Sequence, residues 1–179
     1  MDTNIKSIYS STPKTPTEFS TQAAQDVVEI LRERGLKIAF AESCTGGMVS
    51  AAITGIPGSS AVLDLSIVTY SNSAKVKYTQ VTEEVLREHG AVSSQTAELM
   101  AQGIRSTAGS DIGVGITGIA GPDGGSIEKP VGTVYIAVFS GEKNDVKHFE
   151  FAGDRQAVRE ATCRHALTMI YKILTEVDV

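Results

Sequence analysis

The sequence has no tryptophan, few aromatic residues and only two cysteines in 179 residues. Cys44 and Cys163 lack the paired spacing of a zinc site or of a disulfide-rich secreted domain, so we expect a reduced, cytoplasmic setting. No apolar run approaches the ~18 residues of a membrane helix, and no apolar segment of a secretory signal follows the polar N-terminus. The net charge of −5 gives no reason to expect a nucleic-acid or anionic-membrane partner.

The first twenty residues differ in composition from the rest of the chain. They are rich in Ser, Thr and Pro and show no sustained hydrophobic period, which predicts a flexible N-terminal arm over residues 1–20. Periodic sequence begins near Thr21, and 179 residues suit one well-buried domain better than two. We therefore expect a single domain over residues 21–179.

Hydrophobic periodicity predicts alternating helices and strands in that domain. Helices are expected from Thr21 to Gly35, over 48–53, from Thr82 to Gly90, from Ser93 or Ser94 onward, and after Asp154; strands are expected over 38–41, 66–70, 112–117, 131–139 and 146–152. This order predicts an α/β fold, a three-layer α-β-α sandwich with a mixed, partly parallel sheet. The 131–152 hairpin is its antiparallel part. The strand order does not follow from the sequence.

Several familiar motifs are excluded by their context. Residues 113–118 match G-x-G-x-x-G, but here the motif is itself a strand and does not open a helix, so no dinucleotide cofactor is expected. The S-x-x-K of Ser11 to Lys14 lies in the predicted arm. The three histidines are predicted to be surface residues, and no ligand spacing predicts a catalytic metal.

The remaining polar residues with catalytic potential collect where predicted strands end. Ser43 follows the first strand, Tyr70 and Lys75 follow the second, and Thr117 ends the third, before a glycine-rich loop over 118–126. In open α/β sheets, ligands bind in the crevice beyond the carboxyl ends of the strands. This convergence predicts a small-molecule site.

The residue types at this edge suggest acyl transfer without a histidine. Serine needs a base, and a lysine can serve if burial keeps it neutral. The backbone N–H groups of Thr45, Gly46 and Gly47 would begin a helix and point toward an oxyanion or phosphate. Taken singly, Ser43 or Thr45 could instead cap that helix, and Lys75 could be a solvated helical lysine.

Seven short motifs occur along the chain in the order in which a known protein family has them. They are AESCTGG (41–47), PGSS (57–60), VTYSNSAK (68–75), HGAVS (89–93), TGIAGPDGG (117–125), EKPVGTVY (128–135) and GDR (153–155). Residues 22–175 resemble the C-terminal domain of the competence/damage-inducible protein family, whose active members are nicotinamide-nucleotide amidohydrolases. The resemblance implies conversion of nicotinamide mononucleotide to nicotinate mononucleotide and ammonia in pyridine-nucleotide salvage. Many relatives carry a second domain in front, so this chain is similar to the stand-alone form.

The resemblance also implies residue roles. Ser43 matches the nucleophile and Lys75 the general base, while Tyr70 and Thr117 match residues of the same pocket with supporting or oxyanion roles. We expect substrate contacts from the 45–47 segment, the glycine-rich loop and one arginine, namely Thr45, Gly46, Gly47, Gly118, Gly121, Gly124, Gly125 and Arg155, with Arg159 as the alternative arginine. Either arginine could instead be a surface charge. Ser66 stands where the family often has glycine. No cofactor is implied, and a homo-oligomer is expected.

Two alternatives stay open, one that keeps amide hydrolysis with another nucleophile and one without catalysis. Cys44 could be the nucleophile with Glu42 and Lys75 as partners, as in nitrilase-type enzymes, although neighbouring side chains on an extended segment point in opposite directions. The domain could also be a nucleotide-binding or regulatory module that catalyses no reaction.

Overall fold

The computed structural model describes residues 16–141 and 143–176. Six helices, a short 3₁₀ turn and five strands follow one another in the order α1 (Pro16–Arg34), β1 (Ile38–Glu42), α2 (Met48–Thr54), η1 (Ser59–Ala61), β2 (Leu63–Val68), α3 (Asn72–Tyr78), α4 (Glu83–His89), α5 (Ser94–Ala108), β3 (Ile112–Gly118), β4 (Thr133–Phe139), β5 (Asn144–Glu150) and α6 (Arg155–Thr175). None of the helices in this part of the chain combines the length and apolar character that a bilayer crossing requires.

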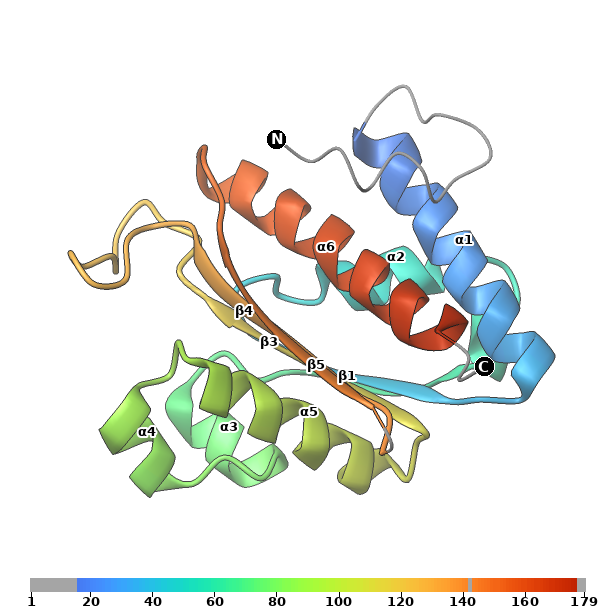
Figure 1. Cartoon of the computed structure of the whole chain (residues 1–179), viewed down its shortest axis with the longest axis horizontal. Helices are drawn as coiled ribbons and strands as arrows, with labels where there is room; N and C mark the ends of the chain where they lie inside the picture. The colour runs from blue at the N-terminus through green and yellow to red at the C-terminus, as the bar shows by residue number, and fades with distance from the viewer. Residues whose placement is uncertain (1–15, 142, 177–179) are drawn as a thin grey trace.

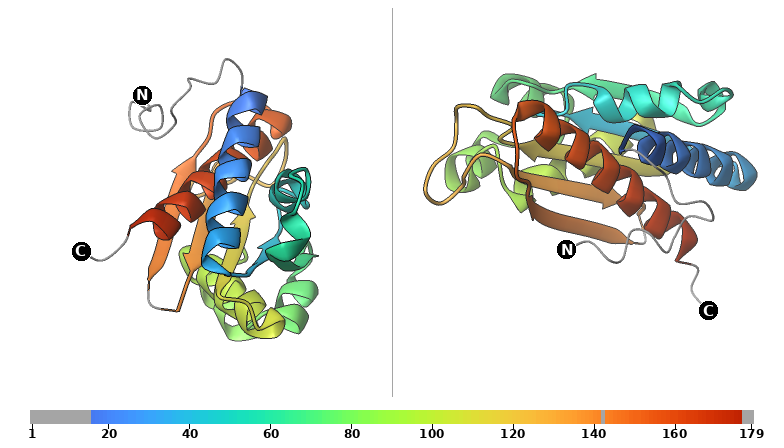
Figure 2. Two further views of the ribbon diagram at one scale, coloured as in Figure 1. Left: turned by 90° about the vertical axis from the view of Figure 1, so that its right-hand side faces the viewer. Right: turned by 90° about the horizontal axis from the view of Figure 1, so that it is seen from above.

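The five strands form one mixed sheet in the order β2-β1-β3-β4-β5. The inner strand β1 pairs in parallel with both β2 and β3. The pairs β3–β4 and β4–β5 are antiparallel. Helices α1, α2 and α6 cover one face and α3, α4 and α5 the other (Figures 1 and 2). The predicted three-layer α/β fold with an antiparallel hairpin is confirmed.

The neighbouring strands β1 and β3 are both buried, but they differ in the residues that allow helices to pack on them. β1 reads IAFAE and every residue is buried, as expected of a parallel strand covered on both faces. In β3, glycine allows α5 to lie directly on the strand: a Cβ at Gly115 would stand 2.1 Å from the carbonyl oxygen of Ala97, and one at Gly113 would stand 2.1 Å from that of Ala101. The prediction that residues 113–118 form a strand and open no helix is therefore correct.

Most of the core lies between the sheet and the layer formed by α1, α2 and α6. Its fully buried side chains include Leu31, Phe40, Val114, Leu167 and Ile170. Smaller clusters lie under α5 on the opposite face, around Met100 and Ile104. Two cores that share one sheet hold the strand ends rigidly, and the candidate site lies at those ends.

Some predicted boundaries were wrong. α1 begins at Pro16, inside the predicted arm, and the rest of that arm lies outside the described residues. β2 covers 63–68 instead of 66–70, because it runs alongside β1 with Leu63 opposite Ile38 and Val68 opposite Glu42. β5 covers 144–150 instead of 146–152.

Helix α3 was not predicted. Its seven residues lack an apolar stripe, and its only fully buried side chain is a lysine, so hydrophobic periodicity gave no signal. His165 was predicted to lie on the surface and does not: its half-buried ring packs against Phe149 and Phe151, with centroids 4.9 Å from each. His89 and His148 are exposed, as predicted.

Candidate active site

Ser43 lies one residue beyond the end of β1, at the carboxyl edge of the sheet. Its backbone N–H continues the pairing with β3 by donating to the carbonyl of Ile116 at 3.0 Å. The residue is buried, with 8% of its surface exposed. Because β1 and β3 are parallel neighbours, Ser43 is placed beside Thr117, the next residue of β3. The sheet thus fixes the backbone of the predicted nucleophile.

Lys75 reaches Ser43 from the first turns of α3. Ser71 caps this helix, and its side chain accepts a hydrogen bond from the N–H of Ala74 at 3.1 Å. The lysine is 2% exposed, and its Nζ lies 3.1 Å from Ser43 Oγ. At this distance the two side chains are within hydrogen-bonding reach of each other.

The surroundings of the Lys75 amine suit a neutral base. Nζ donates to the carbonyls of Thr69 at 2.8 Å and Tyr70 at 3.4 Å. Nζ also donates to Ser43 Oγ, and loss of one proton would leave two N–H groups for the carbonyls and a lone pair toward the Ser43 hydroxyl. Burial lowers the pKa of Lys75 below its usual 10.5, against a smaller raising effect from Cys44. Burial therefore shifts the equilibrium of Lys75 toward the unprotonated form, the form in which an amine can accept the serine proton.

Glu42 fixes the turn that follows the nucleophile. Its fully buried carboxylate accepts hydrogen bonds from the backbone N–H groups of Gly47, Val49 and Ser50 and from the Ser50 hydroxyl. Its own carbonyl accepts from the N–H of Thr69 at 2.8 Å. These contacts commit Glu42 to the start of α2, so the geometry gives no support to its use as a partner of a Cys44 nucleophile.

The 45–47 segment does not face the site as the sequence suggested. Gly46 N–H donates to the carbonyl of Ser43, and Gly47 N–H donates to Glu42, so neither amide is free for a ligand. The carbonyl of Thr45 accepts from Arg159 at 2.9 Å. Both glycines have positive φ, 60° for Gly46 and 93° for Gly47, so the turn itself requires them. For Gly46 and Gly47 the predicted donor role was wrong, because the turn uses their amides internally.

A cavity of about 270 Å³ opens over the Ser43–Lys75 pair. Its wall contains most of the residues that the sequence assigned to the site, namely Ser43, Tyr70, Lys75, Thr117, Gly118, Gly121, Gly124 and Arg155; Gly125 is not among them. Cys44, the alternative nucleophile, lines it too, and so do residues that were not singled out: Asn72, Ala91, Val92, Ile119, Ala120 and Asp123. Most of these stand inside the motifs VTYSNSAK, HGAVS and TGIAGPDGG, so motif membership was the signal that could have found them.

The polar side chains around the cavity already have defined roles. The Thr117 hydroxyl donates to the carbonyl of Ala91 at 2.7 Å. Arg155 bridges two parts of the mouth, donating to the carbonyl of Gly121 at 2.9 Å and to the hydroxyl oxygen of Tyr70 at 3.1 Å. Tyr70 is 61% exposed and lies at the entrance.

Cys44 borders the same cavity, which the expected alternation of neighbouring side chains had argued against. Its thiol is a poor nucleophile, since burial raises its pKa to about 12, with the nearby Glu42 adding to this and Lys75 and backbone N–H groups opposing it. The local chemistry favours Ser43 over Cys44.

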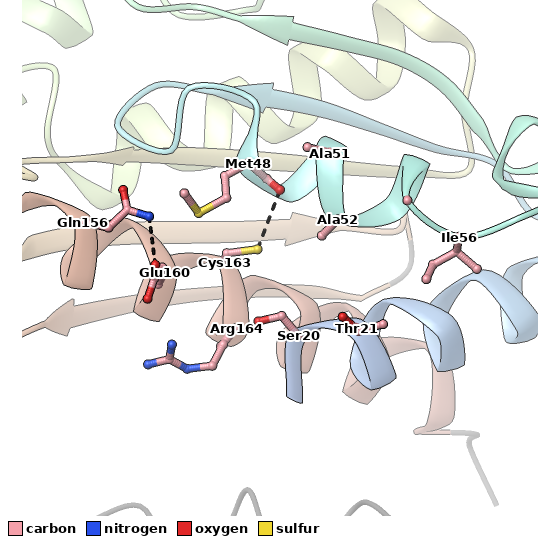
Figure 3. Close-up of a pocket in the computed structure, with 11 residues that line it drawn as sticks. Ser20, Thr21, Met48, Ala51, Ala52, Ile56, Gln156, Glu160, Cys163 and Arg164 are labelled. Atoms are coloured by element: carbon pink, nitrogen blue, oxygen red, sulfur yellow. Dashed lines mark hydrogen bonds between the residues drawn. The ribbon is translucent and has the colours of Figure 1, made fainter. Parts of the chain in front are cut away.

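A larger cavity of about 370 Å³ lies between α1, α2 and α6, in the helix layer on the opposite side of the sheet from α5 (Figure 3). Its polar side chains are largely engaged: Gln156 donates to Glu160 at 2.8 Å, and the Cys163 thiol contacts the Met48 carbonyl at 3.8 Å. It contains neither Ser43 nor Lys75. Size alone would favour this cavity, but only the smaller one contains a nucleophile beside a base. Within the described ranges, no three His, Cys, Asp or Glu side chains gather closely enough to hold a metal ion.

Comparison with known proteins decides the family. The model of the CinA C-terminal domain matches residues 20–174. The chain belongs to this family. A CinA-like protein of Citrifermentans bemidjiense is 52% identical over 145 residues, which are 81% of this chain and 35% of that protein. A CinA-like protein of Syntrophotalea carbinolica is 48% identical over 151 residues, 84% of this chain and 37% of that protein. The chain spans little more than a third of the length of these CinA relatives.

Solved CinA structures share the fold. The competence/damage inducible protein CihA from Agrobacterium tumefaciens is 40% identical and superposes with a TM-score of 0.86, over 88% of this chain and 96% of that one. The competence damage-inducible protein A from Klebsiella pneumoniae is 35% identical with a TM-score of 0.85, over 89% and 99% of the two chains. The resemblance found in the sequence motifs is confirmed at the level of family and fold.

Proposed function

We propose that this domain is a nicotinamide-nucleotide amidohydrolase in which Ser43 is the nucleophile and Lys75 the general base. The observation that carries the proposal is the 3.1 Å distance between Lys75 Nζ and Ser43 Oγ, at two buried residues that line one cavity. A serine beside a lysine with a lowered pKa is a competent arrangement for acyl transfer. Membership of the CinA family supports the substrate class.

The proposed reaction proceeds in two stages. Ser43 Oγ attacks the carboxamide carbon while Lys75 accepts the hydroxyl proton. Lys75 then returns that proton to the amide nitrogen, so that the C–N bond breaks, ammonia leaves and an ester to Ser43 remains. Water, deprotonated by Lys75, attacks the ester, and the proton passes back to Ser43 Oγ as the carboxylic acid group is released. Lys75 ends each cycle neutral, and no other reactant is needed.

The neighbouring hydroxyl groups suggest how the carboxamide is oriented. The Tyr70 hydroxyl accepts from Arg155, so its own proton is available to donate to the substrate oxygen. The Thr117 proton is used by the Ala91 carbonyl, so Thr117 Oγ1 offers only an acceptor, which suits the amide NH₂ group. We assign Tyr70 to the carbonyl oxygen and Thr117 to the leaving nitrogen.

The cavity suits a small anionic ligand. At about 270 Å³ it lies just below the usual range of small-molecule sites, ~300–1,000 Å³. Arg155 uses two donors in the contacts described above and keeps others for a phosphate at the cavity mouth. Gly118, Gly121 and Gly124 present only backbone atoms to the cavity, and at Gly118 and Gly121 a Cβ would collide with Val134 and Val131. Arg159, which holds the Thr45 carbonyl, is the less suitable of the two arginines.

Release of ammonia from nicotinamide mononucleotide tests the proposal. We expect turnover by the purified protein, a loss of roughly 10³-fold or more in Ser43→Ala, and unchanged turnover in the matched control Ser60→Ala, whose serine is exposed on η1. If the wild-type protein releases no more ammonia than Ser43→Ala, the amidohydrolase is excluded. Calorimetric binding of the nucleotide without turnover would then identify a binding module.

A further inference from the structure

The connection between α4 and α5 is held by side chains. Its four successive carbonyl groups, at residues 89–92, each accept a hydrogen bond from a side chain. Lys129 provides two of these contacts with one ammonium group: Nζ donates to the carbonyl of His89 at 2.9 Å and to that of Val92 at 2.7 Å. The carbonyls at the two ends of the 89–92 run therefore bind a single residue, 37 to 40 positions away in the sequence.

The two middle carbonyls have other donors. The Gly90 carbonyl accepts from Ser93 at 3.1 Å and Thr96 at 2.8 Å, both at the start of α5. The Ala91 carbonyl accepts from Thr117 at the end of β3. These contacts join the connection to its own helix and to the sheet. Within the described residues, only Lys129 donates to it from the loop between β3 and β4.

Both segments that Lys129 joins are walls of the cavity over Ser43. Ala91 and Val92 line it from the α4–α5 connection, and Gly118–Gly121 line it from the β3–β4 loop. Lys129 itself does not border the cavity. Its backbone is anchored, because Ser126 N–H donates to the Lys129 carbonyl at 2.8 Å and Lys129 N–H donates to the Ser126 hydroxyl at 3.0 Å. The ammonium group thus reaches the α4–α5 connection from a turn that two hydrogen bonds between Ser126 and Lys129 close.

The charge of Lys129 suits this place. Nζ meets the carbonyl of His89, the last residue of α4, where the helix dipole favours a cation. Lys129 forms no ion pair with a carboxylate among the described residues, so its charge interacts with carbonyl dipoles alone. Hydrogen bonds to charged donors are stronger than those between neutral groups.

We propose that Lys129 is a positioning residue that clamps the α4–α5 connection to the β3–β4 loop and so fixes the shape of the substrate cavity. The effect on enzyme kinetics that we expect from losing these Lys129 contacts rests on the proposed amidohydrolase function. The Ser43–Lys75 pair is held by other contacts, those of Ser43 with Ile116 and of Lys75 with Thr69. Loss of the clamp should therefore weaken substrate binding and leave the chemical step intact.

The test compares Lys129→Met, Lys129→Arg and a control, Lys147→Met. Methionine keeps the unbranched stem and removes the donors, arginine keeps charge and donors, and Lys147 forms only a partly exposed ion pair with Asp145 on the edge strand β5. We expect Lys129→Met to raise KM about tenfold, as loss of a charge-assisted contact does, with kcat within about twofold of wild type. Lys129→Arg should keep KM close to the wild-type value, and Lys147→Met should leave both KM and kcat unchanged.

Hydrogen exchange gives a second result that needs no substrate. Lys129→Met should speed amide exchange in residues 89–93 and 118–131 and leave that of residues 38–50 unchanged. Equal exchange in wild type and Lys129→Met would overturn the clamp, and so would a fall in kcat with KM constant. If the wild-type protein has no amidohydrolase activity, the proposed function fails, and the exchange data alone then decide whether Lys129 holds the two walls.

Discussion

Replacing Lys75 with methionine tests the proposed base and its burial together. The two side chains have similar length and flexibility, so Met can occupy the 2%-exposed site while the amine is removed. A positioned general base contributes roughly 10²–10⁴ in rate. Because the 3.1 Å contact also activates the nucleophile, we expect kcat for ammonia release to fall at least 10³-fold, about 4 kcal/mol in the barrier.

The same variant should remain folded. Two N–H donors disappear, one from the Thr69 carbonyl at 2.8 Å and one from the Tyr70 carbonyl at 3.4 Å. Each such bond contributes about 1 kcal/mol net, so the loss is about 2 kcal/mol of a total of roughly 5–15 kcal/mol. Urea unfolding measures this loss. A folded Lys75→Met protein that keeps kcat within tenfold of wild type would refute the reasoning.

The pH dependence of stability gives an independent check on Lys75. Its pKa is lowered by burial in the folded protein and returns to about 10.5 on unfolding. Between these two values the unfolded chain binds more protons, so the free energy of unfolding should rise with pH in that window. Lys75→Met should lack this rise when the two proteins are compared by urea unfolding. A rise of equal size in both would show that Lys75 is not its source.

Two further predictions concern Cys44 and Gly115. Because burial raises the Cys44 pKa to about 12, we expect Cys44→Ser to keep ammonia release within about threefold of wild type. The thiol of the native protein should also react with iodoacetamide at pH 8 far more slowly than the thiol of the protein unfolded in urea. If Cys44→Ser lost its activity and Ser43→Ala did not, Cys44 would be the nucleophile. Gly115→Ala should lower the free energy of unfolding by about 3 kcal/mol or more, since its Cβ would stand 2.1 Å from a backbone oxygen of α5. The matched control Gly55→Ala, at a helical φ of −66°, should change it by less than about 1 kcal/mol in the same urea experiment.

The sequence predicts a site residue correctly where the position of that residue follows from the strand in which it lies or that it follows. Ser43 follows one predicted strand and Thr117 ends another, and parallel neighbours place such positions at one edge of the sheet. The 45–47 amides could not be judged in this way. The Gly47 amide is taken by the Glu42 carboxylate and the Gly46 amide by the Ser43 carbonyl, and nothing in the sequence pattern shows that turn.

Helix α3 illustrates the same limit for the fold. A lysine on its buried face removes the apolar stripe by which helices are recognised, so the segment reads as polar loop. Only the packed structure shows that the lysine faces inward, where two carbonyls and a serine satisfy its amine.

The sequence by itself determined the alternation of helices and strands, the α/β class, the family and the identity of Ser43 and Lys75 as candidates, because these depend on residue order and short spacings. The tertiary structure decided the strand order, the burial of Lys75 and its contact with Ser43 across 32 residues. It also decided the two hydrogen bonds from Lys129 to the carbonyls of His89 and Val92. The physical reason is that desolvation and hydrogen-bond partners belong to groups brought together from distant parts of the chain, and both the pKa of a base and the shape of a cavity follow from them.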